Sequence, residues 1–333
     1  MKKKFFIIFI ILSLVVTLVL SKGKFIDKPF RVDNKYVLNV ESGDNFYTLL
    51  NKLERESIIS NSHVIKAYLK IKKFNFNVKP GQYTVEKDTS LISFINMLTK
   101  GNKNNLIKVS IPEGYTIEEI GSLLDKNKII EKKDFIMACK EYRLPGFIKN
   151  NPKISYSLEG YLFPNTYTFK KNSSGEEIIK EMLKNFEDTW TGVKNEIKEK
   201  KDYNLDEIIK IASLIEKEAK VKADRAKISS VIYNRLDKKM KLQIDATVLY
   251  ALGHHKDVVT IKDTKIKSPY NTYYINGLPL GPICNPGRES IVAAMNPERT
   301  NYLFYLYKKD ETKQHYFTED YEDFKKAMKK YGY

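Results

Sequence analysis

The sequence predicts an α+β protein, with an N-terminal membrane anchor, two small α+β modules in tandem and a larger mixed α+β domain at the C-terminal end. Three observations support this prediction: an uncharged apolar segment near the start, an internal repeat, and a change of pattern near residue 204. The chain has 333 residues, 42% of them hydrophobic, which is enough for two or three folded domains. The expected boundaries are a cytoplasmic tip at 1–4, the anchor at 5–21, a linker at 22–35, the modules at 36–105 and 106–188, and the last domain at 189–333.

The first segment is typical of a membrane anchor. Met1 and three lysines precede an uncharged apolar stretch from Phe5 to Leu20. A cleaved signal peptide would need small residues before the cut, and Val19-Leu20-Ser21 matches this poorly, so a single-pass anchor that stays attached is favoured. The lysines in front predict a cytoplasmic N-terminus and a body outside the cell membrane.

An internal repeat predicts the two modules. The segment that starts at Val40 matches the one that starts at Ile111 without gaps, at a constant offset of 71 residues (111 minus 40). Gly43 falls on Gly114, and the apolar residues keep helical spacing in both copies. Each copy continues into a Tyr-Thr strand and a further helix, so the unit reads strand, helix, short helix, strand, helix. Two copies of this length are too few for a solenoid.

The pattern changes at Asn204, where a C-terminal group of helices is expected to begin. Asn204 can cap a helix together with Glu207, and an apolar run with helical spacing follows as far as Ala219. The remaining elements expected are a helix through 228–236, a short helix that follows Asp245 and ends before Gly253, a proline- and tyrosine-rich loop at 268–288, a hairpin at 302–307 and 315–318, and a last helix.

The formal net charge of +17 does not by itself predict a nucleic-acid-binding protein. The lysines are dispersed, no zinc-finger spacing or nucleic-acid motif accompanies them, and the anchor places them outside the membrane. Anionic cell-surface polymers and lipid headgroups are the partners that such a charge favours, with a merely solvated basic surface as the simpler alternative. Nucleic acid is not an expected partner.

Two glutamates near the end of the first C-terminal helix are candidate acids. On a helical wheel, the apolar direction of 208–221 lies roughly 65° from Glu218 and roughly 95° from Glu216. Glu218 also stacks over apolar residues of the preceding turn, and such surroundings raise the pKa of a carboxyl by desolvation. The alternative is an ordinary surface helix, in which Glu216 pairs with Lys220 and Glu218 with Lys222.

Each of the other candidate site residues has a structural interpretation as well as a functional one. Asp245 could be a second carboxylate, although a position before a helix is also where aspartate serves as an N-cap. The loop at 268–288 offers tyrosine rings and the Asn271 amide, as sugar-binding surfaces do, but these rings could equally pack the loop against the domain. Three of the four histidines and both cysteines, which lack a metal-ligand or disulfide pattern, are interpreted as structural or exposed: His254, His255, His315, Cys139 and Cys284.

Ordered motifs between 158 and 297 resemble those of the endolytic murein transglycosylase (YceG-like) family. They read LEGYLFPNTY, ASLIEKEA, ISSVIYNRL, LQIDATVLYALG, SPYNTYYINGLPLGPICNPG and ESIVAAMNP. The resemblance accounts for the anchor and implies that the module at 36–105 is LysM-like. It implies a lyase that cleaves peptidoglycan glycan strands between MurNAc and GlcNAc, leaves 1,6-anhydro-MurNAc ends, and acts on nascent strands during cell-wall synthesis.

The resemblance also implies roles for individual residues. The second glutamate of Glu-Lys-Glu, Glu218, becomes the catalytic acid and base, and Glu216 a supporting residue. Around the substrate the matching motifs place Gln243, Asp245, Tyr270, Asn271 and Thr272, with Arg235 and Glu159 as further contributors. Gln243 and Asn271 are expected to position the sugar, Asp245 to orient this set or cap its helix, and Glu159 could equally be a structural partner for a buried loop. No cofactor and no metal are implied.

The sequence departs from the family pattern at Leu280, where a second proline is usual, and at Asn165, where aspartate is common. These departures concern loop shape and local hydrogen bonding. Two alternative functions stay open: a muramidase-like hydrolase that uses Glu218 and Asp245 with water, and a wall-binding protein without activity. The expected partners are peptidoglycan glycan strands and the cell membrane, while contact with cell-wall synthases is left open.

Overall fold

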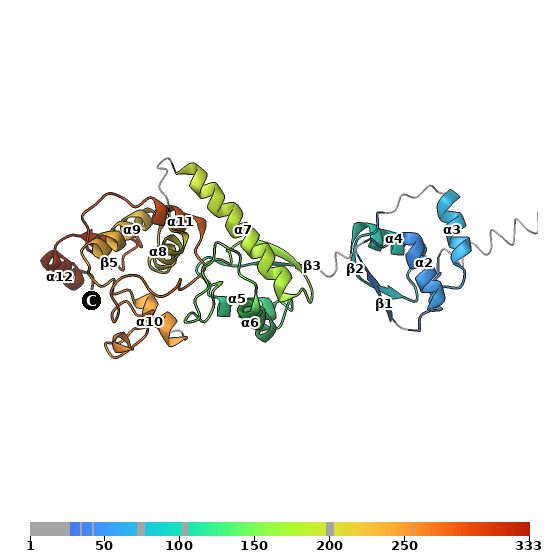
Figure 1. Cartoon of the computed structure of the whole chain (residues 1–333), viewed down its shortest axis with the longest axis horizontal. Helices are drawn as coiled ribbons and strands as arrows, with labels where there is room; N and C mark the ends of the chain where they lie inside the picture. The colour runs from blue at the N-terminus through green and yellow to red at the C-terminus, as the bar shows by residue number, and fades with distance from the viewer. Residues whose placement is uncertain are drawn as a thin grey trace, which may run out of the picture. The chain divides into compact units, whose positions relative to one another are not determined.

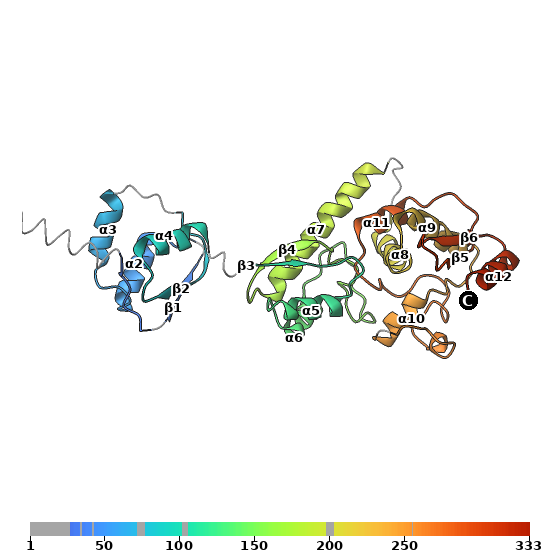
Figure 2. The ribbon, with the colours of Figure 1, turned by 180° about the vertical axis from the view of Figure 1, so that it is seen from behind.

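The computed structural model describes residues 27–333, apart from 34, 42, 72–76, 102–105, 198–202 and 255. The predicted anchor at 5–21 lies outside the described residues. Among the helices that are described, none combines the length and the apolar character needed to cross a membrane. The described part of the chain is a mixed α+β protein that divides into two compact units after Leu106, and Figures 1 and 2 show it from opposite sides.

The first unit contains a pair of strands and three helices around one small core. Its elements are β1 (Lys35–Val40), α2 (Phe46–Arg55), α3 (Ser62–Ile71), β2 (Gly81–Glu86) and α4 (Leu91–Lys100). β1 and β2 are antiparallel, with Leu38 opposite Tyr83. Because side chains alternate between the faces of a strand, both of these residues turn inward, where they are buried against Phe46 and Phe94 of the helices.

The internal repeat predicted from the sequence is present in the structure. α2 and α5 (Ile117–Lys126) begin and end at positions that differ by the predicted offset. Each helix starts with a capping box, which is opened by Asn45 in the first copy and by Thr116 in the second. Gly43 and Gly114, which match in the repeat, both have a positive φ (99° and 78°), a conformation that glycine adopts without strain.

The second unit is larger and mostly helical. Its elements are β3 (Leu106–Ser110), α5, α6 (Lys132–Glu141), β4 (Thr166–Lys170), α7 (Gly175–Glu196), α8 (Leu205–Glu218), α9 (Lys222–Asp237), α10 (Asp245–Leu252), the 3-10 turn η2 (Asp263–Lys265), α11 (Arg288–Met295), β5 (Phe304–Tyr307), β6 (His315–Thr318) and α12 (Tyr321–Lys330). β3 pairs with β4, and β5 forms an antiparallel hairpin with β6. The predicted C-terminal hairpin and last helix are therefore present.

α8 lies inside this unit, in contact with α9, α10 and α11 (Figures 1 and 2). Its residues from Ile208 to Ile215 are buried except for Lys210, which explains why the sequence is apolar on more than one face. The same hydrophobic core continues from Val109 in β3 to Met295 in α11. The residues of the predicted second module and of the predicted last domain thus share one core.

The glycine that follows Glu159 is required by close packing. Gly160 has a φ of 92°, and a Cβ atom at this position would lie 2.7 Å from side-chain atoms of Ile209 and Pro282. Both the backbone conformation and the space therefore exclude a larger residue. This tight contact holds the loop before β4 against α8 and the loop at 268–288.

Candidate active site

Glu218 is the last residue of α8 and lies half-buried where the chain leaves the core helix. Its Oε2 atom accepts a hydrogen bond of 3.1 Å from the hydroxyl of Tyr305 in β5. Burial raises the pKa of Glu218 to about 7, and the charge of Asp245 adds to this, whereas Tyr305 and Lys220 act in the opposite direction. A carboxyl with such a pKa exists in both protonation states near neutrality, as a group that serves as acid and then as base requires.

Asp245 is exposed at the first position of α10, and its side chain does not cap the helix. The N-cap is Ile244, and the Asp245 Oδ1 atom instead accepts a hydrogen bond of 2.6 Å from the Tyr273 hydroxyl. Burial raises the pKa of Tyr273, and the hydrogen bond to Asp245 and the charges of Asp245 and Glu218 raise it further; the charge of Asp245 likewise adds to the effect of burial on the pKa of Glu218. These three side chains therefore belong to one electrostatic cluster.

Arg235 ties together the two chain segments that flank this cluster. It lies near the end of α9, and it donates to the backbone carbonyl oxygens of Leu303 (2.6 Å), Lys241 (3.1 Å) and Leu242 (2.8 Å). Its guanidinium also lies over the ring of Phe304, 5.3 Å from the centroid. Since its donors are directed at backbone carbonyls, Arg235 fixes the start of β5 relative to the segment before α10.

Gln243 lies next to Asp245 with an unusual backbone conformation. Its φ is 54°, in the left-handed region that residues other than glycine adopt rarely. Its backbone N–H donates to the carbonyl oxygen of Thr272 (3.2 Å), while its side chain is exposed. The Oγ1 atom of Thr272 accepts from the backbone N–H of Ile244 (2.9 Å) and bonds to Thr247 (2.9 Å). Thr272 is thus a buried link that sets the conformation of Gln243.

Asn271 and Tyr270 also hold the loop together from inside. Both residues are buried. The Asn271 amide donates to the carbonyl oxygens of Thr264 (2.9 Å) and Ile266 (2.7 Å), and its Oδ1 atom accepts from the backbone N–H of Tyr273 (2.9 Å). The Tyr270 ring packs against the ring of Tyr250 with centroids 4.9 Å apart. This geometry favours an indirect role for Asn271, in which it presents Tyr273 to Asp245.

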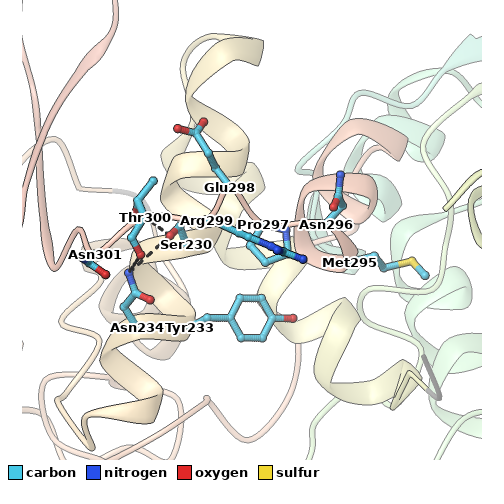
Figure 3. A pocket seen from close by; sticks show the side chains of 10 residues that line it. All are labelled: Ser230, Tyr233, Asn234, Met295, Asn296, Pro297, Glu298, Arg299, Thr300 and Asn301. Carbon is cyan, nitrogen blue, oxygen red and sulfur yellow. Dashed lines mark hydrogen bonds between the residues drawn. The ribbon is translucent and has the colours of Figure 1, made fainter. Parts of the chain in front are cut away.

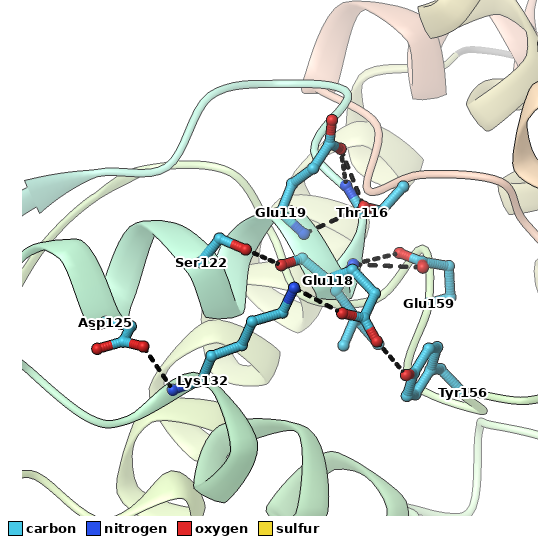
Figure 4. Close-up of polar contacts among 9 residues, drawn as sticks. Thr116, Glu118, Glu119, Ser122, Asp125, Lys132, Tyr156 and Glu159 are labelled. Carbon is cyan, nitrogen blue, oxygen red and sulfur yellow. Dashed lines mark hydrogen bonds and ion pairs between the residues drawn. The ribbon is translucent and has the colours of Figure 1, made fainter. Parts of the chain in front are cut away.

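Glu159 is buried next to the N-terminus of α5, where Figure 4 shows it beside Thr116 and Glu118. The backbone N–H of Ile117 donates to both of its carboxyl oxygens (3.2 and 3.3 Å). The Tyr250 hydroxyl (3.2 Å) and the Asn285 amide (3.0 Å) donate to it as well. Burial raises the pKa of Glu159 to about 8. These contacts favour the structural reading of Glu159, as a buried link between α5, α10 and the loop at 268–288.

Glu216 points to the other side of the end of α8. It forms an ion pair of 3.3 Å with Arg225, in which its side chain is 7% exposed and that of Arg225 is 15% exposed. Its Oε2 atom accepts from the backbone N–H of Gly287 (2.9 Å), just before α11. The surface ion pairs of Glu216 with Lys220 and of Glu218 with Lys222, which a continuous helix would allow, are not formed in the described part of the chain, because α8 ends at Glu218. Lys222 instead pairs with Glu289 (3.0 Å). Glu216 therefore links the end of α8 to α9 and to the start of α11.

Replacing Glu216 with glutamine is expected to reduce stability more than activity. The amide keeps an acceptor for the Gly287 N–H but removes the shorter of two ion pairs of the largely buried Arg225, whose other partner, Glu113, lies at 4.0 Å, and we expect a cost of about 1–3 kcal/mol. Glycan cleavage should stay within about tenfold of the wild type, because Glu216 does not touch Glu218 or Tyr305 through any hydrogen bond in the described residues. Urea unfolding together with an initial-rate assay checks both effects. A complete loss of cleavage in a folded variant would contradict this role.

A pocket of about 510 Å³ opens beside α9 and the end of α11 (Figure 3). Its walls are formed by Ser230, Tyr233 and Asn234 of α9 and by the segment from Met295 to Asn301. The Asn234 amide donates to the carbonyl oxygens of Thr300 (2.8 Å) and Tyr302 (2.9 Å) and so attaches this wall to the chain that leads into β5. Glu218 does not line this pocket, which shares α9 and the approach to β5 with the cluster of Glu218, Asp245 and Tyr273.

Two residues of the cluster, Tyr273 and Tyr305, were not predicted as site residues. Tyr273 directly follows the predicted Tyr270, Asn271 and Thr272, so its position in the same loop could have identified it as a site residue. Tyr305 lies in the predicted hairpin, but Glu218 precedes it by 87 residues, and no local pattern indicates such a contact. Asn285, whose side chain bonds to Glu159, was missed for the same reason, since 126 residues separate the pair.

Comparison with known proteins places these residues in a family. The model of the YceG-like family matches residues 38–330. A Bacillus subtilis (strain 168) protein named endolytic murein transglycosylase is 38% identical over 93% of this chain and 89% of its own length. A Streptococcus pneumoniae serotype 2 (strain D39) protein of the same name is 29% identical over 92% of this chain, which spans 62% of that protein.

A solved structure also matches. The crystal structure of a YceG-like protein from Listeria monocytogenes aligns with a TM-score of 0.61 at 35% identity, and the match covers 89% of this chain and 99% of that one. The family model and the Bacillus subtilis relative each cover most of the sequence. This chain therefore belongs to the YceG-like family.

Proposed function

We propose that this protein is a lytic transglycosylase that cleaves peptidoglycan glycan strands between MurNAc and GlcNAc and leaves 1,6-anhydro-MurNAc ends. The observation that carries the proposal is Glu218, a carboxyl whose pKa of about 7 suits it to act as acid and base. The relatives named endolytic murein transglycosylase support the same activity. The enzyme would be a lyase, because bond cleavage consumes no water.

In the proposed reaction Glu218 acts twice. Protonated Glu218 first gives its proton to the glycosidic oxygen of the leaving sugar, and the bond from that oxygen to C1 of MurNAc breaks. The resulting carboxylate then accepts the proton of the C6 hydroxyl of the same MurNAc. The C6 oxygen forms a new bond to C1, which closes the 1,6-anhydro ring and returns Glu218 to its protonated form. Each step needs only a positioned carboxyl with a raised pKa.

The neighbours of Glu218 suggest how the sugar is handled. Burial is the main cause that keeps the acid protonated, and the negative charge of Asp245 adds to it and would stabilise positive charge that develops at C1. The exposed side chain of Gln243, next to Asp245, is available to the acetamido group of the sugar. Asn271 and Thr272 would contribute by holding Tyr273 and Gln243 in place, because their own polar atoms bond within the protein.

A second candidate function is a muramidase-like hydrolase, in which Asp245 activates a water molecule. It is favoured by the exposure of Asp245 and by its electrostatic influence on Glu218. The two reactions differ in the atom that reaches C1. In the lyase reaction it is the sugar's own C6 oxygen, and in the hydrolase reaction it is an oxygen from the solvent.

Digestion of purified glycan strands in ¹⁸O-labelled water, followed by mass spectrometry, separates these functions. For a lytic transglycosylase we expect MurNAc ends that are lighter by one water than reducing ends and that carry no ¹⁸O. The full chain should be used in detergent, with heat-inactivated protein as the control. Reducing MurNAc ends that contain ¹⁸O as the main product would overturn the proposal in favour of the hydrolase, and binding of glycan without any cleavage would favour a wall-binding protein.

The proposal extends to the rest of the chain. We propose that 5–21 anchors the protein in the cell membrane by a single pass, with a cytoplasmic tip at 1–4 and the catalytic body outside the cell. The apolar composition of that segment and the lysines before it support this. The strand, helix, helix, strand order from β1 to β2 supports a LysM-like module at 36–105. Action on nascent strands, beside cell-wall synthases, would follow from this location.

A further inference from the structure

We infer that the buried pair formed by Asp224 and His315 is a positioning device for Glu218, which it serves by fixing the ring of Tyr305. Through its hydroxyl, Tyr305 in turn decides which oxygen of Glu218 exchanges the proton with the substrate. This inference rests on the proposed function, since it concerns how Glu218 performs it. No residue of this pair belongs to the site predicted from the sequence.

The hydrogen bond from Tyr305 distinguishes the two carboxyl oxygens of Glu218. The hydroxyl donates to Oε2 at 3.1 Å, and an oxygen that accepts this bond is disfavoured as the carrier of the acidic proton. The proton is therefore held on Oε1. After it has been donated, the bond from Tyr305 becomes charge-assisted and stronger, which stabilises the carboxylate. Oε1 is then the basic oxygen that takes the C6 proton, so the same atom gives and receives.

The pair behind Tyr305 is completely enclosed. The Oδ2 atom of Asp224 accepts from the backbone N–H of His315 (2.7 Å) and pairs with its Nδ1 atom (2.9 Å), and each side chain is only 4% exposed. Because a carboxylate accepts and does not donate, Nδ1 carries a proton. Burial, helped by the charges of Lys220 and Lys308, lowers the pKa of His315 below its usual value, although Asp224 acts in the opposite direction. The imidazole is neutral near pH 7.

His315 contacts Tyr305 directly. In the β5–β6 hairpin, Tyr305 is opposite Phe317 and His315 is opposite Tyr307, so the His315 and Tyr305 rings are diagonal neighbours. The two rings meet edge to face, with centroids 5.7 Å apart and an interplanar angle of 81°. The His315 ring is held by the hydrogen bond from its Nδ1 atom, and the backbone N–H of the same residue donates to the same carboxylate oxygen, so the ring is restrained from tilting away. It therefore limits the positions that the Tyr305 ring can take.

The position of Asp224 in the chain connects this support to the catalytic carboxyl. Asp224 lies in the first turn of α9, which begins shortly after Glu218 ends α8. The pair therefore locks the hairpin that carries Tyr305 to the segment that leaves Glu218. Apolar side chains could anchor the hairpin with a larger gain in stability, because a buried charged pair often contributes less stability than an apolar replacement. A directional pair is better explained by a need for a fixed orientation.

The sign of the expected pH effect follows from the groups around Glu218. Burial and the charge of Asp245 raise its pKa, and Tyr273 lies in the same cluster, whereas the Tyr305 hydrogen bond and Lys220 lower it. Loss or misplacement of the Tyr305 hydroxyl removes a contribution that favours the carboxylate. The pKa of Glu218 then rises, so the acid stays protonated to a higher pH and the alkaline limb of the rate profile shifts upward.

The test measures pH profiles of glycan cleavage by the full chain in detergent, for Tyr305→Phe, Asp224→Asn and the double variant. For Tyr305→Phe we expect kcat to fall about tenfold, KM to stay within about twofold, and the alkaline limb to move up by about one pH unit. Asp224→Asn should shift the limb in the same direction by less. The double variant should match Tyr305→Phe alone, since both changes act through one hydroxyl.

Matched controls keep the test specific. Tyr307→Phe removes a hydroxyl from the neighbouring ring of the same strand, which also contacts His315, and Asp237→Asn removes an exposed carboxylate from the same helix. Both should keep the wild-type profile. Thermal melting identifies variants that are merely unstable. An Asp224→Asn variant that melts earlier but keeps the wild-type alkaline limb, or effects that add in the double variant, would reduce the pair to a hairpin anchor and overturn the inference.

A further variant, Glu218→Gln, separates this inference from the proposed function. If Glu218→Gln is inactive while Tyr305→Phe has the wild-type rate and profile, only the positioning role of Tyr305 fails. If Glu218→Gln cleaves glycan at the wild-type rate, the assignment of the acid itself fails.

Discussion

Replacing Glu218 with glutamine is expected to reduce glycan cleavage by about 10²–10⁴-fold, the range that a general acid and base contributes. A side-chain amide has nearly the same shape as the carboxyl but neither gives nor takes a proton at neutral pH. The Tyr305 hydroxyl can still donate to the amide oxygen, so the local structure should persist. Initial rates of product formation measure the loss. An active variant would contradict the assignment of Glu218.

The same substitution should make the protein more stable at alkaline pH. The pKa of Glu218 is raised from 4.5 to about 7 in the folded protein, so between these values the folded state binds more protons than the unfolded state. The free energy of unfolding therefore decreases as the pH rises through this window, and above about pH 7 the full penalty of a buried charge applies. Glutamine does not ionise and does not suffer this penalty.

Thermal melting at two pH values checks the sign. At pH 8 the Tm of Glu218→Gln should exceed that of the wild type by a few degrees, which corresponds to about 1 kcal/mol for a unit of this size. At pH 4.5 the two should melt together, because Glu218 is then largely protonated. A Tm difference that is equal at both pH values would mean that the pKa of Glu218 is not raised.

Replacing Asn285 with alanine is expected to cost about 3–5 kcal/mol of stability. Asn285 is fully buried. Its Oδ1 atom accepts from the backbone N–H groups of Gly160 and Leu162 (2.9 Å each), and its amide donates to the carbonyl oxygen of Tyr115 (2.9 Å) and to Glu159 (3.0 Å). Alanine would leave these buried groups without those partners, at about 1–3 kcal/mol for each group that finds no replacement.

Urea unfolding of the full chain measures this cost, with Asn150→Ala as the matched control because Asn150 is exposed. The control should stay within about 0.5 kcal/mol of the wild type. Asn285→Ala should also lower cleavage, since Asn285 belongs to the loop that presents Tyr273, and Gly287 in the same loop bonds to Glu216. A loss below about 1 kcal/mol would mean that water replaces the amide in this site.

Local patterns predicted most of the elements. The repeat, the helices from α8 to α10 and the C-terminal hairpin follow from apolar spacing and from residues such as Asn204 and Gly253, which flank helices as expected. The details of these ends were less predictable. Asn204 is the N-cap residue of α8, as predicted, yet its side chain donates to Glu207 (3.0 Å) and forms no capping hydrogen bond with the backbone. Asp245 lies inside α10, one position after the N-cap.

The end of α8 shows why pattern alone is insufficient there. The sequence from Glu216 to Lys222 is compatible with one continuous helix and with surface ion pairs. In the structure the helix stops at Glu218, and Glu216 is held by Arg225 and Gly287. Gly287 is 71 residues away in sequence, so the contacts that hold Glu216 at this helix end are tertiary contacts that helical periodicity does not contain.

The sequence predicted those residues of the candidate site that lie within the family motifs. Glu218 and Asp245 fall in one cluster, whereas Glu159 and Glu216 form buried links elsewhere in the same unit. Tyr305 could not be found in this way, because the geometry that joins it to Glu218 is created by folding. The same holds for the pair of Asp224 and His315, whose members are 91 residues apart.

The role of Glu218 is tested most directly by one digest of purified glycan strands by the full chain, in which the wild type, Glu216→Gln and Glu218→Gln are compared for 1,6-anhydro-MurNAc ends by mass spectrometry. We expect such ends from the wild type and from Glu216→Gln, and almost none from Glu218→Gln, with thermal melting to show that all three proteins are folded. Anhydro ends from Glu218→Gln at the wild-type level, or their loss only in Glu216→Gln, would contradict this role of Glu218.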